Sequence, residues 1–419
     1  MQPYDMKEIE ERVILVGVQE SFSEDIEESL DELAELCETA GATVVGRVIQ
    51  NREKIHPGTY IGKGKMDEVA LLTEELDATG IVCDDELSPA QLNNLEKELG
   101  CKVMDRTLVI LDIFAGRANT SEGNIQVELA LLRYRAARLV GLRSSLSRLG
   151  GGIGTRGPGE KKLEMDRRLI HARISQLKAE LAQVQKHREL IRGKRKKDNL
   201  VVAAIVGYTN AGKSTLLNAL TGAEVHANDR LFDTLDPTTR VLHTEQLGDV
   251  LISDTVGFIR KLPHHLVDAF RSTLEELSYA DVLVHVVDAS DPQWRLLAQV
   301  VEDLCRQLGA EKTPRLLVFN KVDLLREDQL PRETGAIYTA ASKGLGLDNL
   351  VDRICRVLGE GLKTVRFVLP YSQAGVLDRL YREANVKKAD YVENGIDIEA
   401  VVDRKTYGRI RELLPQDQR

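Results

Sequence analysis

The sequence predicts a multidomain α/β protein: an N-terminal parallel α/β domain, a helical hairpin stalk, a P-loop domain and a small C-terminal α/β domain. The chain has 419 residues, more than one hydrophobic core usually serves. Short apolar runs alternate with amphipathic stretches along most of it, and one stretch instead shows a heptad repeat without any strand signal. We place the domains at residues 1–110, 111–198, 199–362 and 363–419.

The N-terminal domain is expected to alternate strands and helices. The Val- and Ile-rich run over 12–18 predicts a buried strand that Gly17 closes. A parallel sheet is favoured, because each later strand follows a helix. The elements expected next are a helix over 23–40, a strand over 42–50, a helix over 65–76, a strand over 80–84, a helix over 89–99 and a strand over 102–105.

Residues 120–193 predict two long helices, over about 122–142 and 160–191. Apolar residues recur every seven positions along the second helix, which indicates a seam that needs a partner helix. The connection over 149–160, LGGGIGTRGPGE, is rich in glycine. We therefore expect a hairpin with a Gly-rich tip, against the alternative of a flexible linker. The seam residues are Leu163, Ile170, Leu177, Val184 and Ile191, with Ile174 and Leu181 between them.

Charge is segregated along the chain, although the formal net charge is only −9. Residues 1–100 carry 24 acidic and 8 basic side chains, whereas residues 133–197 carry 19 basic and 5 acidic ones. A cationic arm on an acidic body favours a phosphate-rich partner. The alternative is a solvated helix face.

Several classes of protein are excluded by composition. No run approaches the ~18–20 uncharged apolar residues that span a bilayer, and the acidic N-terminus lacks the apolar segment of a secretory signal. The five cysteines are scattered without a CxxC pair, which disfavours a disulfide framework or a zinc ribbon. We expect a cytoplasmic protein without an integral membrane segment, with peripheral membrane association left open.

A phosphate-binding motif, GxxxxGK[ST], opens the third domain between a predicted strand over 200–206 and an apolar helix start. Its glycines permit a tight turn, its backbone N–H groups face phosphate oxygens, and the helix N-terminus adds a positive end. Lys213 would bridge the β- and γ-phosphates, and the Ser214 hydroxyl would ligate Mg²⁺. The motif comprises Gly207, Tyr208, Thr209, Asn210, Ala211, Gly212, Lys213, Ser214 and Thr215.

A second phosphate motif follows the strand predicted over 250–254. It comprises Asp254, Thr255, Val256 and Gly257. The Asp254 carboxylate would hold Mg²⁺ through water, and the Gly257 N–H would donate to the γ-phosphate. The loop over 231–240 before this strand is expected to carry a threonine that reaches Mg²⁺ and the γ-phosphate. Spacing leaves Thr234, Thr238 and Thr239 open for that role.

The base is chosen by an NKxD motif after the strand predicted over 315–319. The carboxylate of Asp323 would accept hydrogen bonds from guanine N1–H and the N2 amino group. Adenine offers no such pair of donors and would leave the charge unpaired. Lys321 would lie along the base and Asn320 would brace the loop. The motif, Asn320, Lys321, Val322 and Asp323, therefore predicts a guanine nucleotide.

On these motifs the chain resembles the HflX family, in the Obg–HflX superfamily of TRAFAC GTPases. GYTNAGKST, TLDPTTR, DTVGFI, NKVD and GGGIGTRGPGE follow the family pattern over essentially the whole chain. The resemblance implies GTP hydrolysis with Mg²⁺, a mixed, mostly parallel sheet with helices on both faces, and Thr234 as the switch threonine beside catalytic Lys213 and Gly257. Further nucleotide contacts implied are Phe232, Asp233, Leu235, Asp236, Ala340, Ala341 and Ser342.

Three positions depart from the patterns. Asp233 replaces the usual Ala, and Ala340 replaces the usual Ser of the last guanine motif, where the N–H of Ala341 would contact the base. Phe258 stands where Ras-like enzymes have a Gln that orients the attacking water. A phenyl ring makes no such hydrogen bond, so slow intrinsic hydrolysis is expected, with acceleration by a partner.

The resemblance implies that this partner is the large (50S) ribosomal subunit, and that the GTP form dissociates stalled or stressed ribosomes. The hairpin would then contact rRNA and no DNA, and the free chain would be monomeric. Two alternatives remain: a GTP-controlled, ATP-dependent RNA remodeller, for which no second Walker A loop exists, and a regulatory switch that binds a protein effector. The candidate RNA contacts are Arg143, Arg148, Arg156, Lys161, Lys162, Arg167 and Arg168.

The C-terminal domain is expected to be a small α/β piece without chemistry of its own. The run KTVRFVLPY predicts a strand, and a helix is expected over 374–385. Further strands are expected over 389–392 and 396–402, and a short helix over 407–413.

Overall fold

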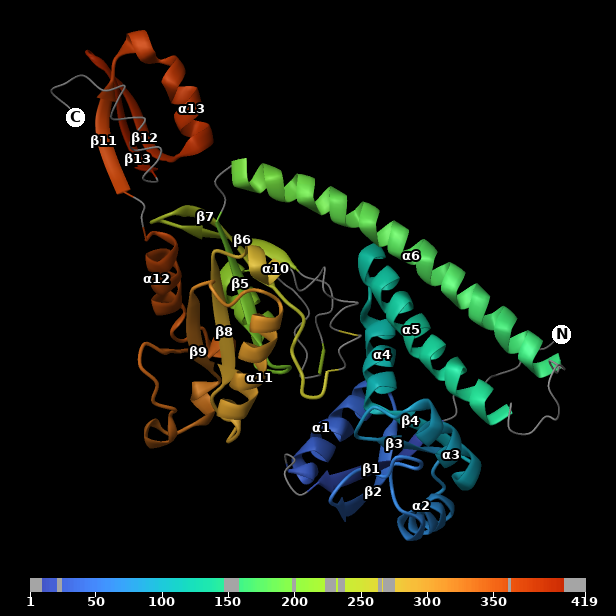
Figure 1. Cartoon of the computed structure of the whole chain (residues 1–419). Coiled ribbons are helices and arrows are strands. Elements are labelled where there is room, and N and C mark those ends of the chain that lie inside the picture. The colour runs from blue at the N-terminus through green and yellow to red at the C-terminus, as the bar shows by residue number, and fades with distance from the viewer. Residues whose placement is uncertain are drawn as a thin grey trace, which may run out of the picture. The chain divides into compact units, whose positions relative to one another are not determined.

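The computed structural model describes residues 10–20, 25–146, 158–197, 201–222, 231–232, 238–262, 266, 276–360 and 363–402 (Figure 1). Contacts divide the chain into two compact units. The first comprises residues 1–182, 229–235 and 261–270, and the second comprises residues 183–228, 236–260 and 271–419. The predicted multidomain α/β fold class is confirmed.

The first unit contains a four-stranded parallel sheet in the order β2-β1-β3-β4. Residues such as Ile14, Val16 and Ile81 are fully buried in its core, because a parallel sheet covered by helices leaves few strand residues in water. Its strands are β1 (Arg12–Glu20), β2 (Thr43–Arg52), β3 (Gly80–Cys83) and β4 (Lys102–Asp105), and its helices are α1 (Ile26–Thr39), α2 (Lys63–Glu75), α3 (Pro89–Leu99) and α4 (Arg106–Arg117).

Local sequence signals fix the ends of these helices. At α3, the Ser88 side chain accepts from the Gln91 N–H while the Gln91 side chain accepts from the Ser88 N–H, a reciprocal capping box. Gly100 ends the same helix at φ +65°, a left-handed conformation that glycine adopts without strain. The predicted bounds of α3 and β4 therefore agree with the structure.

Helix α4 was not expected from the sequence. Its N-terminus is capped by Asp105, whose carboxylate accepts from the Leu108 N–H at 2.9 Å. Val109, Ile110 and Leu111 are all buried, so apolar residues surround most of the helix. Such a helix shows little of the 3.6-residue period on which the prediction relies.

The predicted hairpin forms from α5 (Ser121–Leu146) and α6 (Pro158–Lys197), which Figure 1 shows running alongside each other. Four of the seven predicted seam residues make the contact: Ile170, Ile174, Leu177 and Leu181 pack against Ile125, Leu129, Leu132 and Ala136 of α5. Residues 147–157, which include most of the predicted Gly-rich tip, lie outside the described residues. The hairpin body therefore follows from the repeat.

The second unit contains a six-stranded sheet in the order β10-β9-β8-β5-β7-β6, with β6 antiparallel to β7 and the other pairs parallel. Val284 and Val286 of β8 are fully buried between the covering helices. Its strands are β5 (Val201–Gly207), β6 (Thr239–Thr244), β7 (Gly248–Asp254), β8 (Val282–Asp288), β9 (Arg315–Asn320) and β10 (Ile337–Tyr338), and its described helices are α7 (Lys213–Thr221), α10 (Glu276–Tyr279), α11 (Trp294–Gln307) and α12 (Leu347–Leu358).

The end of the chain forms a three-stranded antiparallel sheet of β11 (Lys363–Leu369), β13 (Gly395–Val402) and β12 (Asn385–Val392), with α13 (Gly375–Glu383) packed on it. The expected α/β piece is thus present. The helix expected over 407–413 lies outside the described residues. Across the described part of the chain, no helix is long and apolar enough to cross a membrane.

Candidate guanine-nucleotide site

The P-loop lies between β5 and α7, at the carboxyl edge of the sheet where α/β folds bind ligands. Asn210 and Gly212 adopt left-handed conformations, with φ of +59° and +88°. Lys213 begins α7, and its buried Nζ donates to the Tyr208 carbonyl at 2.8 Å. Burial lowers the pKa of Lys213 to about 8, against the opposing attraction of Asp254. The loop thus holds a desolvated cation that an anion would stabilise.

Three glycines are required by close approaches. A Cβ on Gly207 would lie 2.3 Å from the Val286 carbonyl oxygen, and a Cβ on Gly212 would lie 2.3 Å from the Asn320 Nδ2. A Cβ on Gly257 would lie 3.0 Å from the Lys213 Nζ. A side chain at any of these three positions would therefore displace its neighbours. Two of them are the glycines of the P-loop, and the third belongs to the second phosphate motif.

The second phosphate motif lies directly beside the P-loop. Asp254, fully buried at the end of β7, accepts from the Ser214 hydroxyl at 2.8 Å and from the Thr255 N–H at 2.9 Å. The Thr255 hydroxyl donates to the Ile205 carbonyl at 2.7 Å. A hydroxyl and a carboxylate in contact offer the hard oxygen donors that Mg²⁺ prefers. This pair therefore fits a magnesium ion.

The backbone after Gly257 is hydrogen-bonded to the P-loop. The Thr209 N–H donates to the Phe258 carbonyl at 2.8 Å, and the Phe258 N–H donates to the Gly207 carbonyl at 3.2 Å. The Tyr208 hydroxyl accepts from the Arg260 N–H at 2.7 Å. Phe258 itself is 1% exposed, so its ring packs in the core. Its position explains why an apolar residue stands there.

Asn320 joins the base-binding loop to the P-loop. Its Nδ2 donates to the Ala211 carbonyl at 3.0 Å. Its Oδ1 accepts from the Ala341 N–H at 3.0 Å and from the Thr339 hydroxyl at 3.2 Å. The Ala341 N–H that the sequence assigns to the base is thus bound to Asn320 in this structure. Thr339 therefore also braces this loop. The sequence motifs do not indicate this role, because Thr339 lies just before the last motif and belongs to none of them.

Two lysines pair with carboxylates at the base-binding loop. Lys321, at φ +59°, forms an ion pair with Asp288 at 2.8 Å. Lys343 contacts Asp323 at 2.9 Å. Hydrogen bonding to Lys343, more than its charge, lowers the pKa of Asp323. Neither Asp288 nor Lys343 is predicted from the sequence. Asp288 lies at the end of β8, distant in sequence from the loop, and Lys343 follows the last residue expected to contact the base.

The remaining predicted contacts divide between described and undescribed residues. Phe232 is buried in the first unit, where its ring meets that of Phe114 edge-on at 4.7 Å. Thr238 and Thr239 lead into β6, and the Thr238 carbonyl accepts from the Asp254 N–H at 2.9 Å. Asp233, Thr234, Leu235 and Asp236 lie outside the described residues. Which threonine reaches the nucleotide therefore stays a prediction, as do the contacts of Thr215, Val256, Val322, Ala340 and Ser342.

The candidate RNA contacts are spread along the hairpin. Arg167 is half-buried on α6, and the exposed Arg168 lies 3.6 Å from Glu164 one helical turn away. Arg148 and Arg156 lie outside the described residues, and the side chains of Arg143, Lys161 and Lys162 are likewise not described. The basic stretch therefore stays a candidate interface.

A polar cluster lies within the first unit, apart from the nucleotide motifs. The fully buried Asp84 accepts from Arg106 at 2.8 Å and from Ser29 at 2.8 Å, and it also pairs with Lys261. Lys261 further contacts Asp85 at 2.8 Å. Burial alone would raise the pKa of Asp84, but the combined attraction and hydrogen bonds of Arg106 and Lys261 outweigh it and lower the pKa. Arg106 and Lys261 together therefore stabilise the ionised form of the buried Asp84.

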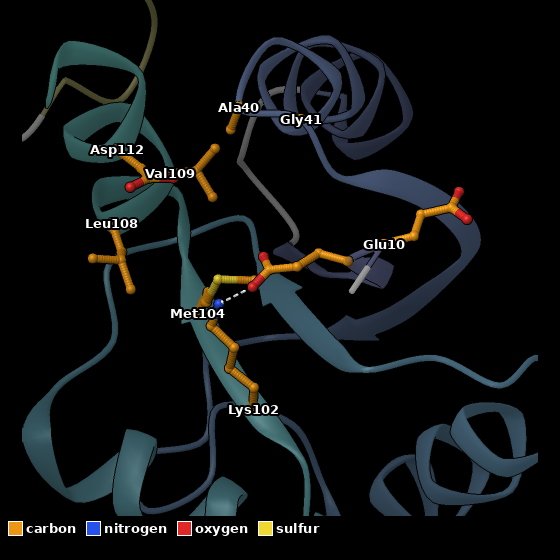
Figure 2. A pocket seen from close by; sticks show the side chains of 9 residues that line it. Glu10, Ala40, Gly41, Lys102, Met104, Leu108, Val109 and Asp112 are labelled. Carbon is orange, nitrogen blue, oxygen red and sulfur yellow. Dashed lines mark hydrogen bonds and ion pairs between the residues drawn. The ribbon is translucent and has the colours of Figure 1, made fainter. Parts of the chain in front are cut away.

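A cavity of about 730 Å³ lies at the amino edge of the first sheet, and Figure 2 shows the side chains that line it. The Lys102 ammonium pairs with Glu11 in it, and Asp112 lies on its rim. Lys102 begins β4, whereas ligands of such sheets bind at the carboxyl ends of strands. The cavity contains no residue of the nucleotide motifs.

Three family models match successive parts of the chain. They are described as GTP-binding GTPase N-terminal, over residues 27–115, GTP-binding GTPase Middle Region, over 117–195, and 50S ribosome-binding GTPase, over 202–321. The last contains the P-loop, the second phosphate motif and the first half of the base-binding loop. The structural site thus coincides with a recognised GTPase domain.

Curated relatives cover nearly the whole chain. The GTPase HflX of Lacrimispora saccharolytica is 56% identical over 409 residues, which is 97% of this chain and 97% of that protein. The GTPase HflX of Escherichia coli is 40% identical over 399 residues, 94% of this chain and 93% of that protein. A solved GTP-binding protein from Sulfolobus solfataricus in complex with GDP is 24% identical, over 84% of this chain and 99% of that one, with a TM-score of 0.43. The identities of 56% and 40% with the two curated relatives, over nearly the full length, show that the chain belongs to the GTPase HflX family.

Proposed function

We propose that the site binds GTP with Mg²⁺ and hydrolyses it slowly until the large ribosomal subunit accelerates the reaction. The observation that carries the nucleotide part is the convergence of three motifs. Asn320 bonds to the Ala211 carbonyl, Ser214 bonds to Asp254, and Gly257 approaches Lys213. These contacts put groups suited to a base, a metal and a γ-phosphate around one loop.

Mg²⁺ would be held by the Ser214 hydroxyl, with Asp254 acting through a bound water. When bound, it neutralises charge on the phosphate oxygens. Thr234 is proposed as a further ligand on the strength of the family pattern. Lys213 would exchange its bond to the Tyr208 carbonyl for phosphate oxygens, and the attraction of those oxygens would raise its pKa again.

Hydrolysis joins a water oxygen to the γ-phosphorus as the bond to the β–γ bridging oxygen breaks, which gives GDP and phosphate. Lys213 and the N–H groups of the P-loop and Gly257 would stabilise the charge that spreads over the γ-phosphate. Phe258, buried and apolar, orients no water. The chain's own residues therefore supply positioning and charge stabilisation, and slow turnover follows.

The partner is proposed from the basic hairpin and the family. Residues 133–197 carry 19 basic and 5 acidic side chains, and the matching family model is described as a 50S ribosome-binding GTPase. Phosphate-rich RNA of the large subunit suits such a surface. Dissociation of stalled or stressed ribosomes in the GTP form is the activity that we propose for the whole chain.

Cosedimentation with separated subunits tests this function. We expect the chain loaded with a non-hydrolysable GTP analogue to pellet with 50S particles, and the GDP-loaded chain to remain largely in solution. Deleting residues 150–159 should abolish pelleting while GDP affinity persists. Equal pelleting in both nucleotide states would contradict the proposal, and pelleting that survives the deletion would remove the tip from it. ATP-driven unwinding of RNA would favour the remodeller instead.

A further inference from the structure

Thr209, the third residue of the P-loop, carries a buried hydroxyl that contributes no hydrogen bond to the described part of the fold. The residue is 6% exposed, and its Oγ1 is buried with no hydrogen-bond partner among the residues that the structure describes. Its backbone N–H donates to the Phe258 carbonyl. A buried hydroxyl without a partner costs free energy that a methyl group of the same size would not. Native proteins keep few such groups, and function is one reason to keep them.

The Thr209 side chain lies where the γ-phosphate is proposed to bind. A Cβ on Gly257 would lie 2.8 Å from the Thr209 Cγ2 and 3.0 Å from the Lys213 Nζ. The Gly257 N–H and the Lys213 ammonium are the two groups assigned to the γ-phosphate. The Thr209 hydroxyl is attached to the same Cβ as that methyl group. The Thr209 side chain therefore lies at the γ-phosphate end of the proposed site and not at the base.

Near this end of the site, a water-orienting glutamine is absent and two hydroxyls are already engaged. Phe258 occupies the position of a water-orienting glutamine and is apolar and 1% exposed. The Ser214 hydroxyl is already bonded to Asp254 at 2.8 Å. Among the described residues of the two phosphate motifs, the Thr255 hydroxyl is bonded to Ile205 at 2.7 Å. Among the described residues, the Thr209 hydroxyl is a buried hydroxyl of the P-loop that has no hydrogen-bond partner.

We propose that Thr209 is a catalytic residue, whose hydroxyl hydrogen-bonds the γ-phosphoryl group and the attacking water during hydrolysis. It supplies part of the orientation that Phe258 lacks. The proposal rests on the proposed nucleotide site. Because the contact strengthens as charge shifts at the γ-phosphate, its loss lowers kcat more than nucleotide affinity.

Replacing Thr209 by valine tests the hydroxyl while keeping the shape of the side chain. In the full chain, single-turnover phosphate release from Thr209→Val should be slower by on the order of 100-fold, the effect of losing one transition-state hydrogen bond. GDP affinity should stay close to that of the unchanged chain. The melting temperature without nucleotide should be equal or higher, because the unpaired hydroxyl is gone. Thr209→Val should also hydrolyse GTP more slowly than the unchanged chain when 50S subunits are added.

Two variants serve as controls. Thr209→Ser keeps the hydroxyl and should retain most of the rate. Thr221→Val removes a threonine hydroxyl on α7 that donates to the Leu217 carbonyl at 2.8 Å, away from the phosphate motifs, and should leave the rate unchanged. A purely structural role would instead show a lower melting temperature and weaker GDP binding for Thr209→Val.

The proposal is overturned if Thr209→Val hydrolyses GTP at the normal rate, or if Thr209→Ser is as slow as valine. Lys213→Ala separates this failure from failure of the site itself. If Lys213→Ala binds GDP normally, the nucleotide site is misplaced. If it loses GDP while Thr209→Val remains fully active, only the role of Thr209 is refuted.

Discussion

At the scale of single residues, Asp323 carries the proposed choice of base, and Lys343 holds one of its carboxylate oxygens at 2.9 Å. Guanine requires both oxygens of that carboxylate, so the base and the ammonium group compete for one of them. The side chain of Lys343 is 59% exposed, and such partly solvated ion pairs are weak. We therefore expect the competition from Lys343 to lower nucleotide affinity only modestly.

We expect Lys343→Met to raise GDP affinity by about two- to fivefold, the range that a weak ion pair allows. The gain should shrink with added salt, because salt screens the pair in the unchanged chain. Isothermal titration at two salt concentrations checks this. Lys312→Met, which removes an exposed lysine of the second unit, is the charge control. A loss of affinity in Lys343→Met beyond that of the control would show that Lys343 assists the base.

His285 makes the second unit sensitive to acid. It is buried in β8, its Nε2 has no partner among the described residues, and burial, aided by Arg315, lowers its pKa to about 4. The unfolded chain binds this proton near pH 6.5, so the folded state loses stability as pH falls from about 6.5 to about 4. Above pH 6.5 both states are neutral and the contribution is constant.

Replacing His285 by leucine should reduce this loss. Between pH 7 and pH 4.5, urea unfolding should show a loss of free energy smaller by up to about 3 kcal/mol than in the unchanged chain. His243→Leu is the matched control, because the side chain of His243 is 81% exposed. An unchanged pH profile in His285→Leu would mean that other groups cause the acid sensitivity.

Much of the site was predictable at this scale because phosphate and guanine recognition depend on short runs of neighbouring residues. Lys213, Ser214 and Gly257 come together as their motifs imply. Thr339 and Lys343 were not predicted, because their side chains contact a loop some twenty residues earlier in the chain and depend on a turn that no motif encodes. Gly346 shows that turn: a Cβ there would lie 2.1 Å from the Tyr338 carbonyl oxygen.

At the scale of elements, the hairpin depends on a seam that occupies only part of α6. Leu177 is fully buried in that seam, whereas Leu190 on the same helix is 69% exposed. The repeat continues to Val184 and Ile191, and Leu190 lies beside it, so periodicity alone does not show how far the partner helix accompanies α6. In the antiparallel hairpin the C-terminal part of α6 faces the start of α5, at Ser121, so the length of α5 limits the seam.

The two leucines give a matched test. Leu177→Ala should destabilise the hairpin by about 3 kcal/mol, since it removes a buried side chain and leaves a cavity. Leu190→Ala should change stability by less than about 0.5 kcal/mol. Hydrogen exchange of the α5 and α6 amides measures both effects. Equal protection in the two variants would contradict the packing described for the seam.

At the scale of the whole molecule, charge segregation is the property that the sequence displayed most directly. The sheets confirm the α/β class, while the division into four domains, which rests on alternating periods, stays a prediction. The grouping of residues 229–235 and 261–270 with the first unit was beyond sequence reasoning. It depends on contacts such as Lys261 with Asp84, which are distant in sequence and carry no local signal.

Ribosome binding by this basic arm should be strongly salt-dependent. Each phosphate contact releases counterions, so the logarithm of the binding constant should fall linearly with the logarithm of salt concentration. Replacing Arg167 and Arg168 together by glutamine should lower the slope by up to about two if both touch phosphates. Arg306→Gln, a surface change on α11, should leave the slope alone. A slope near zero in the unchanged chain would argue for a protein contact instead of RNA.

The division of the chain into units also bears on how its catalysis can be dissected. The polypeptide passes from one unit to the other at residue 182 and again around 229–235 and 261–270. A fragment excised after the hairpin would leave Phe232 without Phe114 and Lys261 without Asp84. Both orphaned segments flank the second phosphate motif in sequence. Turnover numbers from such a truncated enzyme would come from a protein that lacks both contacts, so hydrolysis should be measured on a chain that keeps the first unit.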